Sequence, residues 1–213
     1  MTAALRDHVG VPAKQTLNVT VLSLGGMRDI MSEMEAMFLN SALALFRNVE
    51  DYARADPRAN VSMVRAYKSE HFYAAALRPA DILHLIGHAD STSLQIGGSK
   101  VKMTAREVGR RGRLGTLRLP RVIVSTACRL SSQAWRDGLH DAGVELLIGG
   151  TGNVTPANLA AFDMAFYSAL LSQIRKGEDT LDRVEKSFEL GNAHYRAIHA
   201  SGTPRVTFEL SRL

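Results

Sequence analysis

A histidine and the only cysteine of the chain each follow a run of apolar, β-favouring residues. His88 comes directly after DILHLIG (residues 81–87), and Cys128 ends the run PRVIVSTAC (residues 120–128). A deprotonated thiol is a strong nucleophile, and an imidazole that titrates near neutral pH can exchange protons with a reacting group. The two residue types could therefore act as the nucleophile and the acid–base partner of covalent catalysis.

The segments around these two residues alternate between strand and helix patterns. An amphipathic helix after Gly26 is expected to turn Ile30, Met34, Met37, Phe38, Ser41 and Leu45 toward the core. A small hairpin is expected over residues 93–104, around Gly97 and Gly98. Strands are expected over residues 16–24, 60–68, 81–87, 120–127, 144–152 and 204–210, and further helices over residues 69–80, 131–143, 155–177 and 180–201.

This alternation predicts an α/β fold, a three-layer αβα sandwich with a mostly parallel six-stranded sheet and helices on both faces. Such sheets place their functional sites at the carboxyl ends of the strands. If strands 81–87 and 120–127 are neighbours, about 5 Å apart, His88 and Cys128 emerge at the same edge of the sheet. The expected site therefore depends on the pairing of these two strands.

Length and composition favour a single domain over residues 1–213, with residues 1–15 as a flexible lead. One cysteine cannot form an internal disulfide, which fits a reducing compartment. The sequence has neither a secretory signal pattern nor an apolar run long enough to cross a membrane. We therefore expect a cytoplasmic protein that does not associate with membranes.

The net charge of +5 is local rather than general. Residues 102–121 hold seven basic residues and one acidic residue, so the remainder of the chain is close to neutral. This basic segment has no interleaved aromatic residues, and nucleic-acid binding is not expected. Gly109, Gly112 and Gly115 favour a mobile, solvated connection there.

With the motifs HLIGHA and STACRLSS, followed by LHDAGVELLIGG and AFDMAFYSALL, the chain resembles the CHAT family of caspase-like cysteine peptidases, which is grouped with caspases, separases and gingipains. HLIGHA provides His84, Gly87 and His88, with Ala89 where the family has glycine, and STACRLSS provides Cys128 after an alanine. LHDAGVELLIGG and AFDMAFYSALL extend the resemblance from about residue 17 to about residue 195.

The resemblance implies a caspase-like fold and a cysteine endopeptidase in which His88 and Cys128 are catalytic. It implies that the thiol attacks a peptide carbonyl of a protein substrate and forms an acyl-enzyme that water cleaves. Proteases of this kind serve bacterial regulated proteolysis or defence. Backbone N–H groups of Gly87, Ala89 and Cys128 are expected to hold the oxyanion.

In several caspase-like families, the residue two before the cysteine helps to form the pocket for the side chain that precedes the cut. Here it is Thr126, which predicts little preference for a charged side chain unless Asp90 or Asp163 points into the pocket. The glycine-rich stretch IGGTGN lacks a nucleotide-binding fingerprint. We expect it to form a strand-exit turn or one wall of a peptide cleft, with Gly150, Thr151 and Asn153 in contact with substrate.

Several alternatives remain open. His84 is expected to be a buried, hydrogen-bonded residue, and no metal or cofactor is expected because no further ligand cluster accompanies the two histidines. Alanine at position 89 leaves open a catalytically inactive, partner-binding module, and a doubly wound nucleotide-binding protein is a second rival. The short connection after helix 131–143 leaves little room for a processing loop. We therefore expect an uncleaved chain that is controlled by a regulatory protein or an attached domain.

Overall fold

The computed structural model describes residues 16–25, 32–37, 39, 59–97, 102–172, 179–198 and 207–213. The lead over residues 1–15, and the expected helix positions Ile30, Phe38, Ser41 and Leu45, lie outside the described residues. None of the helices in the described part is both long and apolar enough to span a membrane.

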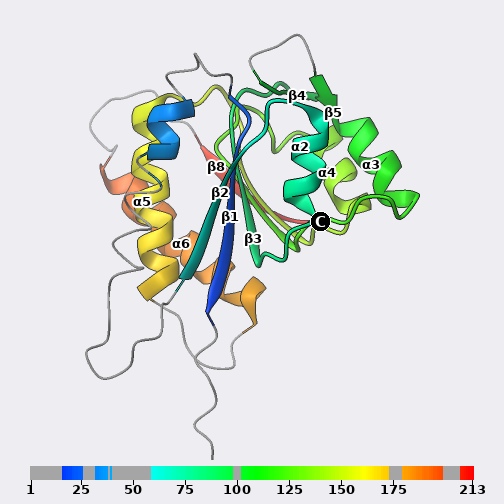
Figure 1. Cartoon of the computed structure of the whole chain (residues 1–213). Helices are drawn as coiled ribbons and strands as arrows, with labels where there is room; N and C mark the ends of the chain where they lie inside the picture. The colour runs from blue at the N-terminus through cyan, green and yellow to red at the C-terminus, as the bar shows by residue number, and fades with distance from the viewer. Residues whose placement is uncertain are drawn as a thin grey trace, which may run out of the picture.

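A six-stranded sheet with the order β2-β1-β3-β6-β7-β8 forms the centre of the molecule (Figure 1). All neighbouring strands are parallel except β8, which runs antiparallel to β7. The strands are β1 (Leu17–Ser23), β2 (Ala59–Arg65), β3 (Ile82–Ile86), β6 (Val122–Ser125), β7 (Leu146–Gly150) and β8 (Phe208–Arg212), with a separate hairpin of β4 (Ser93–Gln95) and β5 (Lys102–Thr104).

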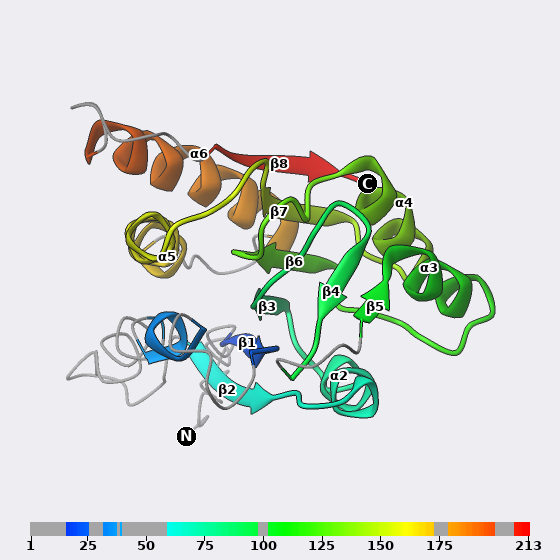
Figure 2. The same ribbon diagram turned by 90° about the horizontal axis from the view of Figure 1, so that it is seen from above.

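Helices cover both faces of the sheet, as the sequence predicts. Figure 2 shows α5 and α6 on one face and α2, α3 and α4 on the other. Successive side chains of β3 alternate between the faces, so that Ile82 and Ile86 join the α5 side while Leu83 and Leu85 join the α4 side. The helices are α2 (Ser69–Ala76), α3 (Ala105–Arg113), α4 (Gln133–Asp141), α5 (Pro156–Ser172) and α6 (Thr180–Ile198).

The pairing on which the expected site depends is present. β3 and β6 are parallel neighbours, with Leu85 opposite Ser125. His88 and Cys128 each lie three residues beyond this pair, past the carboxyl ends of their strands. The sheet therefore delivers both residues to one edge.

The glycine-rich basic segment is a helix, and the prediction of a mobile connection was wrong. Thr104 caps α3 by accepting a hydrogen bond from the backbone N–H of Glu107 at 3.1 Å. A Cβ at Gly112 would lie 2.3 Å from the carbonyl oxygen of Asp141, and one at Gly138 would lie 2.4 Å from that of Ala105. The glycines are present because α3 and α4 pack at close range, and packing supplies the stability that glycine withholds from a helix.

Three of the six arginines in residues 102–121 are paired with carboxylates in the described structure. Arg111 lies 3.1 Å from Glu107 and also over the ring of Tyr73, and Arg121 lies 2.6 Å from Glu145. These intramolecular pairs neutralise part of the local positive charge.

The apolar face predicted for the first helix was wrong within its described part, residues 32–37 and 39. Met34 and Met37 are exposed, whereas Glu35, Ala36 and Leu39 are buried. A carboxylate therefore lies where a methionine was expected. A polar contact explains why Glu35 faces inward, because its carboxylate accepts a hydrogen bond from the hydroxyl of Thr126 just after β6.

Candidate active site

Cys128 lies in the turn between β6 and α4 and is partly exposed rather than sealed in the core. Its Sγ accepts a hydrogen bond from the backbone N–H of Val154 at 3.4 Å. The thiol is thus in contact with a backbone donor and also open to solvent, just before α4, which begins at Gln133. The position therefore suits a nucleophile better than a packing residue.

The residue after the cysteine has an uncommon backbone conformation. Arg129 has a φ of 56°, and it is the only non-glycine residue with a positive φ in the described ranges. The left-handed region costs an ordinary side chain about 1 kcal/mol or more. Such strain is found more often at functional sites than elsewhere.

The IGGTGN stretch packs against the turn that holds Cys128. Ser131 donates from its hydroxyl to the carbonyl of Gly150 at 3.0 Å, and the N–H of Arg129 points to the carbonyl of Gly152 at 3.3 Å. Thr151 and Asn153 are exposed beside it. The stretch is a strand-exit turn that borders the cysteine, as expected.

His88 is exposed on the neighbouring strand exit and lines a pocket of about 120 Å³ with Ala89, Asp90, Ser93, Gln95 and Lys102. Two hydrogen bonds tie this loop to the segment that follows Cys128. The hydroxyl of Ser132 donates to the carbonyl of Ser91 at 2.6 Å, and the indole N–H of Trp135 donates to that of Asp90 at 3.1 Å. The segments that hold the imidazole and the thiol are thus fixed to each other.

The backbone around His88 leaves N–H groups for a ligand. Among the described residues, the N–H groups of Ala89 and Cys128 donate no hydrogen bond, which suits an oxyanion site. Gly87 has a φ of 154°, and a Cβ there would lie 2.9 Å from that of Leu24. Glycine is required at position 87, but not at position 89, where Ala89 has no positive φ and pairs with Leu94 in an ordinary β-bridge.

Asp90 holds the loop in shape through its carboxylate. Its Oδ1 accepts from the N–H groups of Thr92 at 2.9 Å and Ser93 at 2.7 Å, and its Oδ2 accepts from the hydroxyl of Ser93 at 2.7 Å. The hydrogen bond from the Ser93 hydroxyl, followed by that from the Thr92 N–H, lowers the pKa of Asp90 below its ordinary value. The carboxylate is therefore engaged within its own loop.

Asp90→Ala is expected to destabilise the protein by at most about 1 kcal/mol, because the carboxylate is solvent-screened. A lowered pKa in the folded state stabilises the fold above the ordinary carboxyl pKa, near pH 4, and this contribution is lost as the pH falls through the lowered pKa. Urea unfolding at pH 7 and at pH 3 measures it, with Asp137→Ala on α4 as the control. The difference between Asp90→Ala and the parent protein should shrink at pH 3; a constant difference would contradict the assignment.

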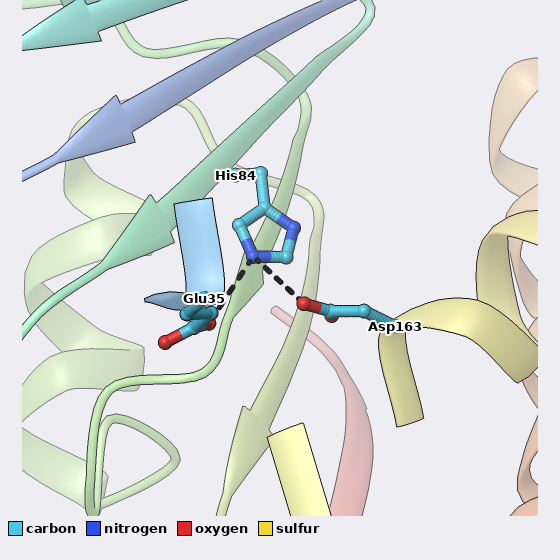
Figure 3. Close-up of side chains that lie close together, drawn as sticks. All are labelled: Glu35, His84 and Asp163. Atoms are coloured by element: carbon cyan, nitrogen blue, oxygen red, sulfur yellow. Dashed lines mark ion pairs between the residues drawn. The ribbon is translucent and has the colours of Figure 1, made fainter. Parts of the chain in front are cut away.

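A buried polar cluster, which the sequence did not predict, includes His84 of β3, the strand that precedes His88. Nε2 of His84 lies 4.0 Å from Oε1 of Glu35 and 3.9 Å from Oδ2 of Asp163, and all three side chains are buried (Figure 3). Nδ1 of His84 is hydrogen-bonded to the hydroxyl of Tyr167 at 2.8 Å, which confirms that His84 is buried and hydrogen-bonded. Burial, followed by the charge of Glu35, raises the pKa of Asp163 well above its ordinary value.

Two residues assigned to substrate binding therefore lie away from the exposed edge. Thr126 is buried and donates to Glu35, and Asp163 faces His84 rather than the pocket beside His88. No described contact tests their role in binding a substrate, which stays a prediction.

The described fold is a caspase-like α/β sandwich, similar to that of a cysteine protease of known structure. The structure of a secreted C11 cysteine protease from Bacteroides thetaiotaomicron, in complex with an irreversible peptide inhibitor, is similar with a TM-score of 0.58 and 13% sequence identity. The similarity covers 93% of this chain and 66% of that protein. At this identity the likeness defines the fold alone.

Two other structures are less similar. The Saccharomyces cerevisiae separase in its complex with securin gives a TM-score of 0.47 at 15% identity, covering 88% of this chain and 12% of separase. A short-chain flavodoxin associated with a bacterial microcompartment gives 0.35 at 13% identity, covering 84% of this chain and 99% of that protein. These scores are too low to support a conclusion. No protein-family model and no curated protein sequence matches the chain.

Proposed function

We propose that the protein is a caspase-like cysteine endopeptidase, of the CHAT type, in which Cys128 is the nucleophile and His88 the general acid. The observation that supports this most directly is the shared sheet edge. Parallel pairing of β3 with β6 brings an exposed imidazole and a partly exposed thiol to the same end of adjacent strands. This is the placement that a thiol nucleophile and its proton donor require.

The proposed reaction uses groups that the chain itself provides. The thiolate of Cys128, whose sulfur accepts a hydrogen bond from the Val154 N–H, attacks the carbonyl carbon of a peptide bond. The N–H groups of Cys128 and Ala89 stabilise the negative charge on the carbonyl oxygen. His88 gives a proton to the departing amine, and water then hydrolyses the thioester and regenerates the thiol.

The surroundings favour a neutral side chain before the cut. Thr126 offers no charge, the carboxylate of Asp90 is held by Ser93 and Thr92, and that of Asp163 faces a histidine. In this proposal the turn after β7, with Gly150, Thr151 and Asn153, forms the wall of the peptide cleft that lies opposite the His88 loop. A peptide library should therefore be cleaved without a strict requirement for Arg, Lys or Asp, and such a requirement would contradict this assignment.

A thiol-directed peptide probe tests the function. Mass spectrometry should find the probe on Cys128, and hydrolysis of a fluorogenic peptide library should disappear in Cys128→Ala while the fold is retained by circular dichroism. A protein that neither reacts with the probe nor cleaves the library would instead be the inactive, partner-binding module. Labelling without hydrolysis would leave a reactive thiol and contradict the peptidase.

The same proposal includes the class of substrate and the way in which the activity is regulated. A protein substrate is expected, in bacterial regulated proteolysis or defence in the cytoplasm. Regulation is proposed to come from a partner protein or an attached domain, because only a short connection joins α4 (Gln133–Asp141) to β7 (Leu146–Gly150). Intact mass before and after activity should therefore be unchanged.

A further inference from the structure

The cluster of Glu35, His84 and Asp163 lies apart from the proposed dyad and has no role in the mechanism above. Its side chains come from the helical segment 32–37, from β3 and from α5, and they point toward one another (Figure 3). Nε2 of His84 and both carboxylate oxygens of Asp163 have no hydrogen-bond partner within the described structure. Buried polar atoms without partners are rare because each is costly.

Nε2 of His84 is too far from either carboxylate for a direct hydrogen bond. Nε2 of His84 lies 4.0 Å and 3.9 Å from the two carboxylate oxygens, beyond the 2.7–3.2 Å of ordinary hydrogen bonds. At the tetrahedral angle, two zinc–ligand bonds of about 2.1 Å place their ligand atoms about 3.4 Å apart. One ligand atom from each of the three residues lies within 4.8 Å of the others, so shifts of about half an ångström would close a coordination shell.

We propose that Glu35, His84 and Asp163 bind one divalent cation of the zinc type, through one imidazole nitrogen and two carboxylate oxygens. Imidazole with carboxylates is a donor set that suits zinc and its neighbouring transition metals. Three protein ligands leave a coordination position for water. This site goes beyond the proposed peptidase function and does not depend on it.

The neighbouring groups hold the donors in orientations that suit a cation. The hydrogen bond between Tyr167 and Nδ1 of His84 leaves Nε2 directed at the carboxylates, which is the arrangement around most metal-binding histidines. Thr126 donates to Oε1 of Glu35 and orients that carboxylate in the same way. Both supports come from the protein itself, so the donors are placed before a cation arrives.

Charge also favours a cation. Two carboxylates buried within 4.8 Å of each other repel, and an uncompensated buried charge is strongly unfavourable. A divalent cation balances both charges while the imidazole remains neutral. The fold then keeps two acids in its interior without protonating either.

Binding of Zn²⁺ to the chelator-treated full chain tests the proposal. Calorimetry should find one site per chain, and a hundredfold excess over Kd should raise Tm by about 5 °C or more. Mn²⁺, lower in the usual affinity order, should bind more weakly. Anomalous X-ray scattering from crystals soaked in Zn²⁺ should give a peak among Nε2 of His84 and the two carboxylates.

Matched variants separate this site from the surface. Asp163→Asn keeps the size of the side chain and should weaken zinc binding at least a hundredfold, while Asp137→Asn, beside the exposed His140 on α4, should leave it unchanged. Tyr167→Phe should weaken binding about 10–100-fold through loss of the orienting hydrogen bond. Circular dichroism verifies that each variant is folded. If a variant does not fold, the anomalous peak from crystals of the parent protein still tests where zinc binds.

Three results would overturn the proposal. They are the absence of zinc binding by the parent protein, undiminished binding by folded Asp163→Asn, and an anomalous peak only at surface residues such as His140. None of them bears on the peptidase proposal, because labelling of Cys128 is measured separately.

Discussion

Replacement of His88 by alanine is expected to lower the rate of peptide hydrolysis by about a hundredfold to ten-thousandfold, the range for a general acid–base residue. The reason is that the departing amine would lose its proton donor while the thiol of Cys128 remains. His88 is exposed, so the substitution should change the free energy of unfolding by no more than about 0.5 kcal/mol. A large loss of rate with little loss of stability identifies a catalytic role.

The measurement is kcat/KM on the library peptide that the parent protein cleaves best, together with urea unfolding of both proteins. His140→Ala provides the matched control, because His140 is also an exposed histidine but lies on α4, away from the sheet edge. Equal kcat/KM for His88→Ala and the parent protein would remove the imidazole from the mechanism. Loss of activity in both variants would point to a general effect on the protein.

The placement of the proposed dyad could be predicted because it depends on two strong and local signals. The runs that end at His88 and Cys128 are rich in apolar residues, which is typical of central parallel strands buried on both faces. Once the two strands are neighbours, a residue a fixed distance beyond each must reach the same edge. The pairing of Leu85 with Ser125 confirms this step.

The buried cluster could not be found in the same way, because it is assembled by tertiary contacts. Glu35, His84 and Asp163 are far apart in the sequence and come from three elements. Helical periodicity, moreover, put Met34 and Met37 on the inner face, whereas the structure buries Glu35 there. Hydrophobic patterns rank a glutamate as exposed, and only its polar neighbours explain why it is not.

Local glycine content misled the sequence-based prediction for residues 106–118. Glycine is unfavourable in helices by about 1 kcal/mol, so three glycines among arginines suggested a mobile connection. In the structure two of them, Gly109 and Gly112, lie where α3 meets α4, and Gly115 follows the helix with a φ of 66°. The segment is helical because it packs against α4, and the sequence of the segment alone does not reveal that contact.

Gly112→Ala is accordingly expected to destabilise the protein by about 2 kcal/mol. The added Cβ would lie 2.3 Å from the carbonyl oxygen of Asp141 and 2.6 Å from Cα of Ala142, and these backbone atoms cannot rotate away. Overpacking of this kind costs up to about 3 kcal/mol. Alanine would return about 1 kcal/mol through its higher helix propensity, so the clash dominates.

Thermal unfolding should show this as a fall in Tm of about 4–8 °C for a chain of this length. Gly152→Ala is the control, because a Cβ at Gly152 would have no atom within 4 Å, and it should unfold close to the parent protein. Since α4 follows the turn that holds Cys128 and Trp135 anchors the loop of His88, separation of α3 from α4 should also reduce hydrolysis. A Gly112→Ala protein as stable as the parent would mean that the two helices do not pack at this distance, and that the glycines have another role.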